Sequence, residues 1–410
     1  MPPAPPHLGP GRIPRAIFLL GLTSLLTDVS SEMIFALLPL FLTAGLGAGA
    51  VFLGLVEGVA DAVSSLLKLA SGHLVDRTRR RKPLVLAGYG LATLVRPLIA
   101  LATAPWHVLA VRVTDRVGKG LRTTPRDVLI ASAARPGEAG RAFGFHRAMD
   151  HAGAVLGPLL ASALLAAGLA IRGVFALSIV PGLLAVGCVL LLREPVPGPA
   201  APAGGTSATR APAPGSALPG PLPRTLKTWL GILALFSLGN ASDAFLLLRA
   251  HELGVPVAVV PLLWSALHVS KVACSSAGGR LSDRMPRVRL IAAGWGVYAA
   301  SYVGLALARG PVAVFAIFLV YGAYYGLTEP AERALLRDLV PEEQRGRAYG
   351  AYHFVVGAAA IPAGLLAGAL WQTWGATPAL AFGAVLAGMA SVLLLAWSRN
   401  PEVRPTPRRA

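Results

Sequence analysis

The most unusual feature of this sequence is a run of charged side chains inside an apolar segment, residues 108–132. The run consists of Arg112, Asp115, Arg116, Lys119, Arg122, Arg126 and Asp127. At about 100° per residue, these side chains fit within an arc of about 140° on an α-helix. A charge at the centre of a bilayer costs roughly 2.5–3.5 kcal/mol. We therefore expect this face to line a cavity, with a network neutralised by acids on neighbouring helices as the structural alternative.

Two acids in the first apolar segment are candidates for moving protons. Asp28 lies near the middle of residues 16–44 and Glu32 lies one turn further along. We expect Asp28 to face Lys119, and Glu32 to lie near Arg116 or Asp115. Burial raises the pKa of a carboxyl and a nearby base lowers it, so a carboxyl in such a setting can exchange protons in the physiological range. The spacing predicts proton coupling through Asp28 or Glu32, with fixed ion pairs as the alternative.

The second apolar segment repeats this theme. Glu57, Asp61 and Lys68 fall within about 40° on a helical wheel, and the position aligned with Asp61 in the second half of the chain is His268. Histidine titrates near neutral pH and commonly serves in proton transfer. Asp61 and His268, at equal depth in the two halves, therefore predict one proton-handling or substrate-facing position in each bundle, and a packed, hydrogen-bonded histidine is the alternative.

Residues that could bind a substrate occur in both halves of the chain. The candidates are Arg116, Lys119, Arg122, Asn240, Asp243, Tyr321, Tyr325 and Glu329. Tyrosines can stack on a ligand and donate hydrogen bonds, although they also pack in cores. A further cluster is predicted to form a gate or an anion site: His146, Arg147, Asp150 and His151. The alternative is that these residues are simply solvated at the mouth of the cavity. The expected cavity is basic on one wall, and aromatic with acids on the other.

These residues must be positioned by membrane-spanning helices. The chain has 410 residues, of which 55% are hydrophobic and only 14% are charged, a composition too apolar for a soluble fold of this size. Twelve apolar segments are each about long enough to cross a bilayer: 16–44, 51–71, 83–103, 108–132, 143–168, 173–192, 228–249, 257–278, 290–308, 311–335, 349–371 and 377–397. Only helices and closed barrels satisfy their backbone groups in lipid, and strand-like alternation is absent. The sequence predicts an all-α integral membrane protein.

The chain is also duplicated. Gly72-His-Leu-Val-Asp76-Arg77 recurs as Gly279-Arg-Leu-Ser-Asp283-Arg284. Between the halves, residues 194–226 are built of Pro, Ala, Gly, Ser and Thr, a composition that cannot bury enough surface to fold. We expect a six-helix bundle over 1–193, a disordered cytoplasmic linker over 194–226, and a second, pseudo-symmetric six-helix bundle over 227–410. Duplicated bundles of this kind are typical of secondary transporters.

The distribution of charge predicts the orientation. The net charge is +18, but the bases are spread over alternate loops rather than gathered in one module, which argues against a nucleic-acid partner. Because Lys and Arg favour cytoplasmic loops, we expect both termini and the linker to be cytoplasmic in a multi-pass protein of the cell inner membrane.

The repeated Gly-x-Leu-x-Asp-Arg loop, the six-plus-six topology and the unstructured linker together resemble the major facilitator superfamily. The resemblance implies a conformational latch at this loop, formed by Gly72, Asp76, Arg77, Arg80, Asp127, Gly279, Asp283 and Arg284. A second motif, formed by Gly153, Gly157 and Pro158, resembles the antiporter motif of the superfamily, with Ala161 and Ser162 where that motif has its final glycines.

Taken together, the sequence predicts a secondary transporter of a small molecule that works by alternating access, with proton-coupled efflux as the leading mode. An organic-anion carrier that uses the basic face of residues 108–132 is one alternative, and a non-transporting membrane sensor is another. A nucleophile elbow, a zinc-ligand spacing and a phosphate-binding loop are absent, so we expect no enzyme activity, metal or cofactor. The cysteines, Cys188 and Cys274, have no pairing pattern. A monomer is expected, because one chain holds both halves of the site.

Overall fold

The computed structural model describes residues 13–78, 81–134, 139–192, 221–341 and 344–399. The elements of the first half are α1 (Arg15–Phe35), α2 (Leu38–Leu40), η1 (Phe41–Gly45), α3 (Ala50–Thr78), α4 (Arg81–Val95), η2 (Arg96–Leu101), α5 (Pro105–Ala133), α6 (Ala139–Ala166), α7 (Ile171–Leu177) and α8 (Ile179–Leu190). Those of the second half are α9 (Arg224–Gly239), α10 (Ala244–Glu252), α11 (Val260–Arg284), α12 (Arg287–Leu307), α13 (Pro311–Leu339), α14 (Arg345–Trp374) and α15 (Ala376–Trp397).

These elements form twelve spans, because some consecutive pieces continue one another across the bilayer. Within the described residues, 10 helical stretches are long and apolar enough to cross a membrane. The other two spans are α5, which carries the predicted row of charges, and α11, whose apolar part Val260–Cys274 is shorter. The predicted membrane-spanning helices are thus confirmed, although several of them are broken.

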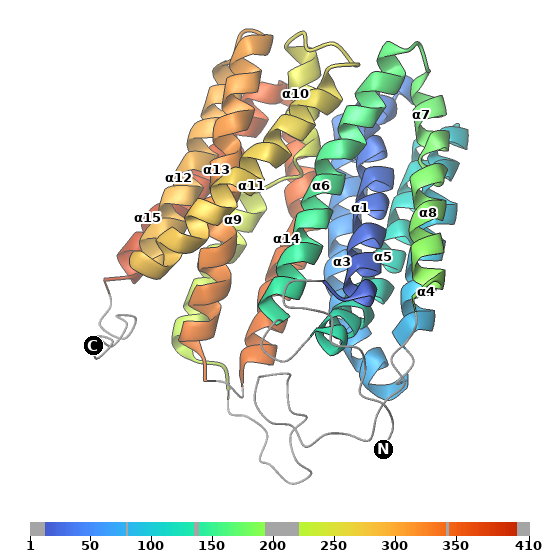
Figure 1. The fold of residues 1–410 in the computed structure, drawn as a ribbon. Coiled ribbons are helices and arrows are strands. Elements are labelled where there is room, and N and C mark those ends of the chain that lie inside the picture. Colours follow the sequence, from blue (N-terminus) through green and yellow to red (C-terminus); the bar gives the residue numbers. More distant parts are fainter. Residues whose placement is uncertain (1–12, 79–80, 135–138, 193–220, 342–343, 400–410) are drawn as a thin grey trace, which may run out of the picture.

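The helices are arranged as two bundles of the same design (Figure 1). In the first bundle, α1 packs on α6 and α8, and α5 packs on α3 and α4. In the second bundle, α9 packs on α14 and α15, and α13 packs on α11 and α12. Each contact in one bundle has its counterpart in the other, as the sequence duplication predicts.

Glycines allow the closest of these contacts and recur at matching places in the two bundles. Gly120 on α5 lies against Leu67 of α3, and Gly326 on α13 lies against Cys274 of α11. Small residues allow membrane helices to approach closely enough to gain van der Waals contact. The repeated glycines therefore set the same helix spacing in both bundles.

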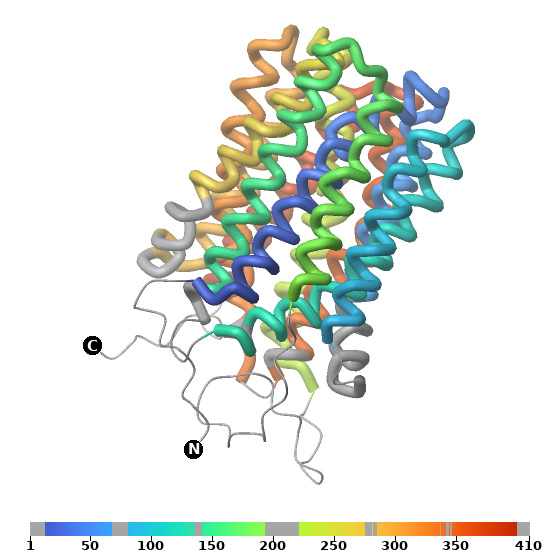
Figure 2. Tube along the Cα trace, turned by 45° about the vertical axis from the view of Figure 1, so that its right-hand side comes forward, coloured from blue at the N-terminus to red at the C-terminus, as the bar shows by residue number. Residues whose placement is uncertain are grey.

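The two bundles meet through α3 with α14 and through α6 with α11. At the first interface the backbones touch, because a Cβ added at Gly54 would overlap the carbonyl group of Gly364. At the second interface, Ser265 Oγ donates a hydrogen bond of 3.0 Å to the Val155 carbonyl oxygen. In both views the start of α1 and the end of α8 lie at the same end of the molecule (Figures 1 and 2). We call this the terminal end, and the other the opposite end.

Two spans are broken at matching positions, the first span between α1 and α2 and the seventh span between α9 and α10. Pro39 lies directly after the first break, and residues 240–243 form the second. Proline cannot donate a backbone hydrogen bond and interrupts a helix. The break in the seventh span places Asp243 at the start of α10.

One expected boundary needs correction. Helix α9 begins at Arg224, so residues 224–226, which were expected in the linker, are helical. Pro223 occupies the position before this helix, where its fixed backbone angle favours the start of a helical turn. The rest of the predicted linker up to residue 220 lies outside the described residues.

The contact between α3 and α14 yields a test of the fold. We expect Gly54→Ala to lower the stability of the purified protein by about 1–3 kcal/mol, because the added methyl group must push apart two backbones in contact. Gly231→Ala on α9 is the matched control, since a Cβ there meets no heavy atom within 4 Å. Thermal unfolding in detergent compares the two variants, and equal melting temperatures would show that this contact is not tight.

Candidate functional site

A buried ion pair anchors the charged row of α5. Arg96, at the start of η2, donates from Nε to Asp115 Oδ1 at 2.7 Å and from Nη1 to the Thr27 carbonyl oxygen at 3.0 Å. Both charged side chains are almost fully buried. An ion pair in such a place holds its geometry only when further hydrogen bonds satisfy it. Arg96 therefore fixes the fourth span to the first and third.

A second ion pair connects α5 to α3 and reaches the other bundle. Arg112 Nη2 lies 2.9 Å and 3.0 Å from the two carboxylate oxygens of Glu57. Ser242, in the break of the seventh span, donates from Oγ to Glu57 Oε2 at 3.3 Å. The Glu57 carboxylate is thus held from both bundles at once.

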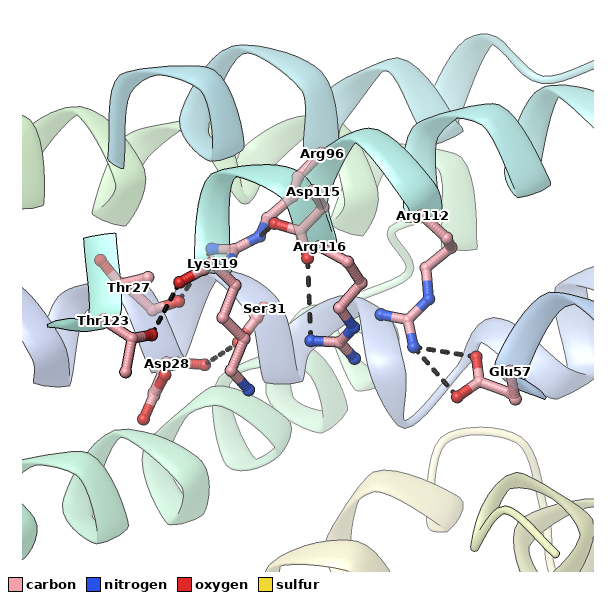
Figure 3. A network of polar contacts seen from close by, with 10 residues as sticks. All are labelled: Thr27, Asp28, Ser31, Glu57, Arg96, Arg112, Asp115, Arg116, Lys119 and Thr123. Carbon is pink, nitrogen blue, oxygen red and sulfur yellow. Dashed lines mark hydrogen bonds and ion pairs between the residues drawn. The ribbon is translucent and has the colours of Figure 1, made fainter. Parts of the chain in front are cut away.

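Between these pairs, bases of α5 face acids from two neighbouring helices. Figure 3 shows the side chains of Arg112, Arg116 and Lys119 leaving α5 toward the same side, with Asp28 close to Lys119. Lys119 acts electrostatically on Asp28, as expected. Asp61 of α3 has an exposed side chain. Among its charged neighbours, Arg116 exerts the strongest electrostatic effect on it.

The carboxylates of Asp28 and Asp61 differ from the others in this network. Among the described residues, neither of them accepts a hydrogen bond or forms an ion pair at contact distance, and their charged neighbours act from further away. Glu57 and Asp115, in contrast, are held directly by arginines. The network therefore contains fixed carboxylates and carboxylates free to change their partners.

Acids and bases balance in the first bundle. The acids near the centre are Asp28, Glu32, Glu57, Asp61 and Asp115, and the bases are Arg96, Arg112, Arg116, Lys119 and Arg122. The basic wall expected from the sequence is thus matched by an equal number of acids contributed mainly by α1 and α3.

Glu32 lies elsewhere than expected. Its Oε2 accepts a hydrogen bond of 2.8 Å from Trp264 Nε1 on α11, and the Trp264 ring packs on Phe35 with 5.0 Å between ring centroids. The expected contact with Arg116 or Asp115 is replaced by this bond to the other bundle. Glu32 and Glu57 are therefore carboxylates of the first bundle that accept hydrogen bonds from the second.

In the second bundle, a cluster of polar and aromatic groups surrounds Asp243. Tyr321 and Tyr325 donate from their hydroxyls to Asp243 Oδ1 and Oδ2, both at 2.7 Å. Lys271 Nζ lies 3.4 Å from Oδ2. Three of the predicted cavity residues, Asp243, Tyr321 and Tyr325, thus form one site, which Lys271 completes.

The remaining cavity candidates lie further apart. Arg122 is buried inside the first bundle with its guanidinium over the Tyr89 ring, 4.5 Å from the centroid. Asn240 donates from Nδ2 to the Tyr324 hydroxyl at 3.4 Å. Glu329 lies 3.8 Å from Arg147 of α6, so the predicted gate cluster does reach across to the other bundle. His146 and Arg147 both lie within 4 Å of Asp150, which also accepts a hydrogen bond from Ser24.

The two equivalent positions, Asp61 in the first bundle and His268 in the second, have different surroundings. The His268 ring packs edge-on against Trp264 with 5.0 Å between centroids, and its Nε2 has no hydrogen-bond partner in the described part of the chain. The charged groups that act on it are Lys271 and His151 rather than Asp61. Each bundle thus has a titratable side chain at this position, and the charged groups that act on Asp61 differ from those that act on His268.

The glycines of the predicted antiporter motif support the helix that carries Asp28. A Cβ at Gly153 would lie 2.8 Å from the Asp28 Cβ, and one at Gly157 would lie 2.9 Å from the Glu32 Cβ. Pro158 follows inside α6. These small residues let α6 press directly on the turns of α1 that hold both acids.

The predicted latch can be described only at Asp127, whose Oδ1 accepts hydrogen bonds of 3.0 Å and 2.9 Å from the neighbouring Arg126. The other members lie outside the residues whose side chains the structure describes: Gly72, Asp76, Arg77, Arg80, Gly279, Asp283 and Arg284. Within the described residues, no group of His, Cys, Asp and Glu is suited to a metal ion, and Cys188 and Cys274 are both free.

Sequence reasoning missed several residues that complete the site. Arg96 was not singled out, although an arginine in the middle of an apolar segment is a signal in its own right. Trp264, Ser242 and Lys271 were not chosen either. Their roles depend on contacts across the two bundles, and the pattern along one helix carries no information about those contacts.

Known proteins share this architecture. The family model of the Major Facilitator Superfamily matches residues 20–361 and 228–410. An MFS-type transporter of Methanocaldococcus jannaschii is 32% identical over 390 residues, covering 93% of this chain and 94% of the relative. The multidrug resistance protein MdtH of Photorhabdus laumondii is 33% identical over 142 residues, 35% of each chain.

A solved structure of similar fold is that of a bacterial homologue of the human lysosomal transporter Spinster, in an inward-facing and occupied conformation. It superposes with a TM-score of 0.73 at 17% sequence identity, and the alignment covers 95% of this chain and 98% of that chain. The family match and the relative that spans nearly the whole chain show that this protein belongs to the Major Facilitator Superfamily, whose members are membrane transporters rather than enzymes.

Proposed function

We propose that this protein exports a small molecule in exchange for protons by alternating access, and that Asp28 carries the exchanged proton. The observation that supports this most directly is the setting of Asp28. It lies near the middle of the first span, under the influence of Lys119 and Arg122, while no described residue holds its carboxylate by a hydrogen bond or an ion pair. A carboxylate that is not fixed can gain or lose a proton without the loss of a strong contact.

A proton on Asp28 changes the balance of charge around it. The charged groups that face Asp28 from neighbouring helices are Lys119 and Arg122 of α5 and Asp150 of α6, and Glu32 lies on the same helix. When Asp28 is neutral, the attraction between α1 and the bases of α5 weakens. A conformational equilibrium shifts by the difference between such interactions in its two states.

A path of contacts connects Asp28 to the interface of the bundles. Gly153 of α6 packs on the turn of α1 that holds Asp28. Two residues further along α6, the Val155 carbonyl oxygen accepts the hydrogen bond from Ser265 of α11. A change in the packing of α1 on α6 is therefore transmitted to the second bundle through direct contacts.

Export and orientation have separate support. The partial similarity to a multidrug resistance protein and the Gly153, Gly157 and Pro158 motif both favour efflux. The excess of bases in the loops of the terminal end favours a cytoplasmic position for that end, in the inner membrane of the cell. The substrate would then enter from the cytoplasm.

The alternative function, transport of an organic anion, is not supported by the balance of charge in the first bundle. It depended on a surplus of bases on α5, but near the centre of the first bundle the acids of α1, α3 and α5 equal in number the bases of α5 and η2. Ion pairs fix Arg96 and Arg112, and Arg122 is buried against Tyr89. A site of balanced charge favours proton exchange over the attraction of anions.

Replacement of Asp28 tests the coupling. We expect Asp28→Asn to abolish transport driven by a pH gradient, with a loss of about 100-fold or more, because the amide keeps the size of the side chain but cannot take up a proton. Ethidium accumulation in everted vesicles, energised by an imposed pH gradient, measures this. The control is Asp338→Asn at the terminal end, where the carboxylate pairs with Arg287 away from the site. Gradient-driven transport at the control level in Asp28→Asn would refute the role of Asp28.

The bond between Glu32 and Trp264 yields a second test. Trp264→Phe removes the donor and keeps an aromatic ring against Phe35, so we expect the opposite end to open more often. A cysteine placed at Val51, near Gln372 of the other bundle, should then react several-fold faster with a membrane-impermeant maleimide, in a background without Cys188 and Cys274.

The matched control for this test is Trp229→Phe. The indole nitrogen of Trp229 is buried without a hydrogen-bond partner in the described part of the chain, so its loss breaks no bond between the bundles. Equal labelling rates in the two variants would show that the Glu32 bond does not hold the opposite end closed.

A further inference from the structure

The cluster around Asp243 has the composition of a cation-binding site. The Asp243 carboxylate accepts hydrogen bonds from the hydroxyls of Tyr321 and Tyr325. Asp243 is the residue that immediately precedes α10. The Lys271 ammonium lies 3.4 Å from this carboxylate, 3.6 Å from the centroid of the Tyr325 ring and 5.2 Å from that of the Trp264 ring. A carboxylate with two aromatic faces is the arrangement by which proteins recognise ammonium groups.

This cation cage, formed by Asp243, Trp264, Tyr321 and Tyr325, lies beside the interface between the bundles. The indole of Trp264 is bonded to Glu32 of the first bundle, so the cage borders the interface between the halves. The side chains of Lys271 and Asp243 are 14% and 12% exposed, respectively, so the cage is not fully buried. Midplane sites at the interface of repeated bundles are where secondary transporters handle substrate.

The Lys271 ammonium can move out of the cage because its side chain is flexible. Its ammonium is a point charge on a flexible stem of four carbons. Glu329 lies one turn beyond Tyr325 on α13, toward the terminal end, and both Lys271 and Glu329 act on His151. The Glu329 carboxylate, which also lies 3.8 Å from Arg147 and 3.9 Å from Arg333, therefore gives the displaced ammonium an alternative partner.

We propose that the cation cage is the subsite for an ammonium group of the substrate, and that Lys271 occupies it until substrate arrives. The chemical class is that of organic cations, from primary amines to quaternary ammonium compounds. Exchange of one cation for another leaves Asp243 always paired, which avoids the cost of an unpaired buried charge. The inference builds on the proposed export function and adds the class of substrate to it.

The test measures binding of choline to the purified full-length protein by calorimetry at constant ionic strength. Lys271→Met removes the resident charge and keeps an unbranched side chain, so we expect choline to bind at least about tenfold more tightly than to the unchanged protein. Lys271→Gln, whose amide can still donate to Asp243, carries the same expectation if the methionine variant does not fold.

Two controls assign the gain to the cage. Lys271→Arg retains a resident cation and should bring no gain, and Asp243→Asn combined with Lys271→Met should lose the gain. Dimethylbutanol, the uncharged carbon isostere of choline, should not bind more tightly to Lys271→Met. The proposal is overturned if choline binds no more tightly after removal of the lysine charge, if the gain survives without the Asp243 carboxylate, or if the isostere gains equally.

This measurement is separate from the test of proton exchange. Binding is measured at equilibrium without a gradient, so the expected pattern can hold even if Asp28→Asn continues to transport. Conversely, a transporter that depends on Asp28 but shows no effect of Lys271→Met on choline binding would retain the proposed function and lose this subsite.

Discussion

The neutralisation of charge inside the bilayer is the constraint on which this structure depends. Helix α5 carries charges that lipid cannot solvate, so acids of α1 and α3 must face it, and Arg96 must lie close enough to hold Asp115. Such proximity requires small contact residues. Gly118 of α5 lies against the backbone of Gly88 on α4, and Gly120 against Leu67 on α3. The glycines and the charges therefore depend on each other: close packing brings the partners within reach, and pairing makes a charged helix tolerable in a membrane.

The two bundles share their packing and differ in their chemistry. At the repeat spacing that relates Gly120 to Gly326, Asp115 corresponds to Tyr321 and Lys119 to Tyr325. Thus α13 presents neutral hydroxyl groups where α5 presents charges. Hydroxyls hold one carboxylate, Asp243, in a fixed geometry, whereas the first bundle keeps carboxylates with exchangeable partners. In the proposed mechanism, recognition therefore belongs to the second bundle and proton exchange to the first.

The sequence predicted those features that repeat along one helix. Apolar segments and duplicated motifs predicted the spans and the two bundles, and the arc of charges on 108–132 predicted acids opposite it, among them Asp28 near Lys119. Features that depend on packing between helices were not predictable in the same way. The bond from Trp264 to Glu32 depends on how α11 meets α1, and so does the packing of Trp264 on Phe35. The breaks before Leu38 and Ala244 redirect side chains that a straight helical wheel misplaces.

Carboxylates of the first bundle contribute to the connection between the bundles, beside the bond from Ser265 to Val155 and the pairing of Arg147 with Glu329. Glu32 accepts a hydrogen bond from Trp264, and Glu57 accepts one from Ser242. Glu32 follows Asp28 by one helical turn, and Gly157 and Gly153 of α6 press on these same two turns. The Asp28 carboxylate itself forms no hydrogen bond or ion pair with the second bundle in the described part of the chain. A proton on Asp28 can thus alter the pairing of α1 with α5 while the contacts between the bundles stay intact. Those contacts would break in a later step. Proton uptake and opening are then separate events that are linked through α1.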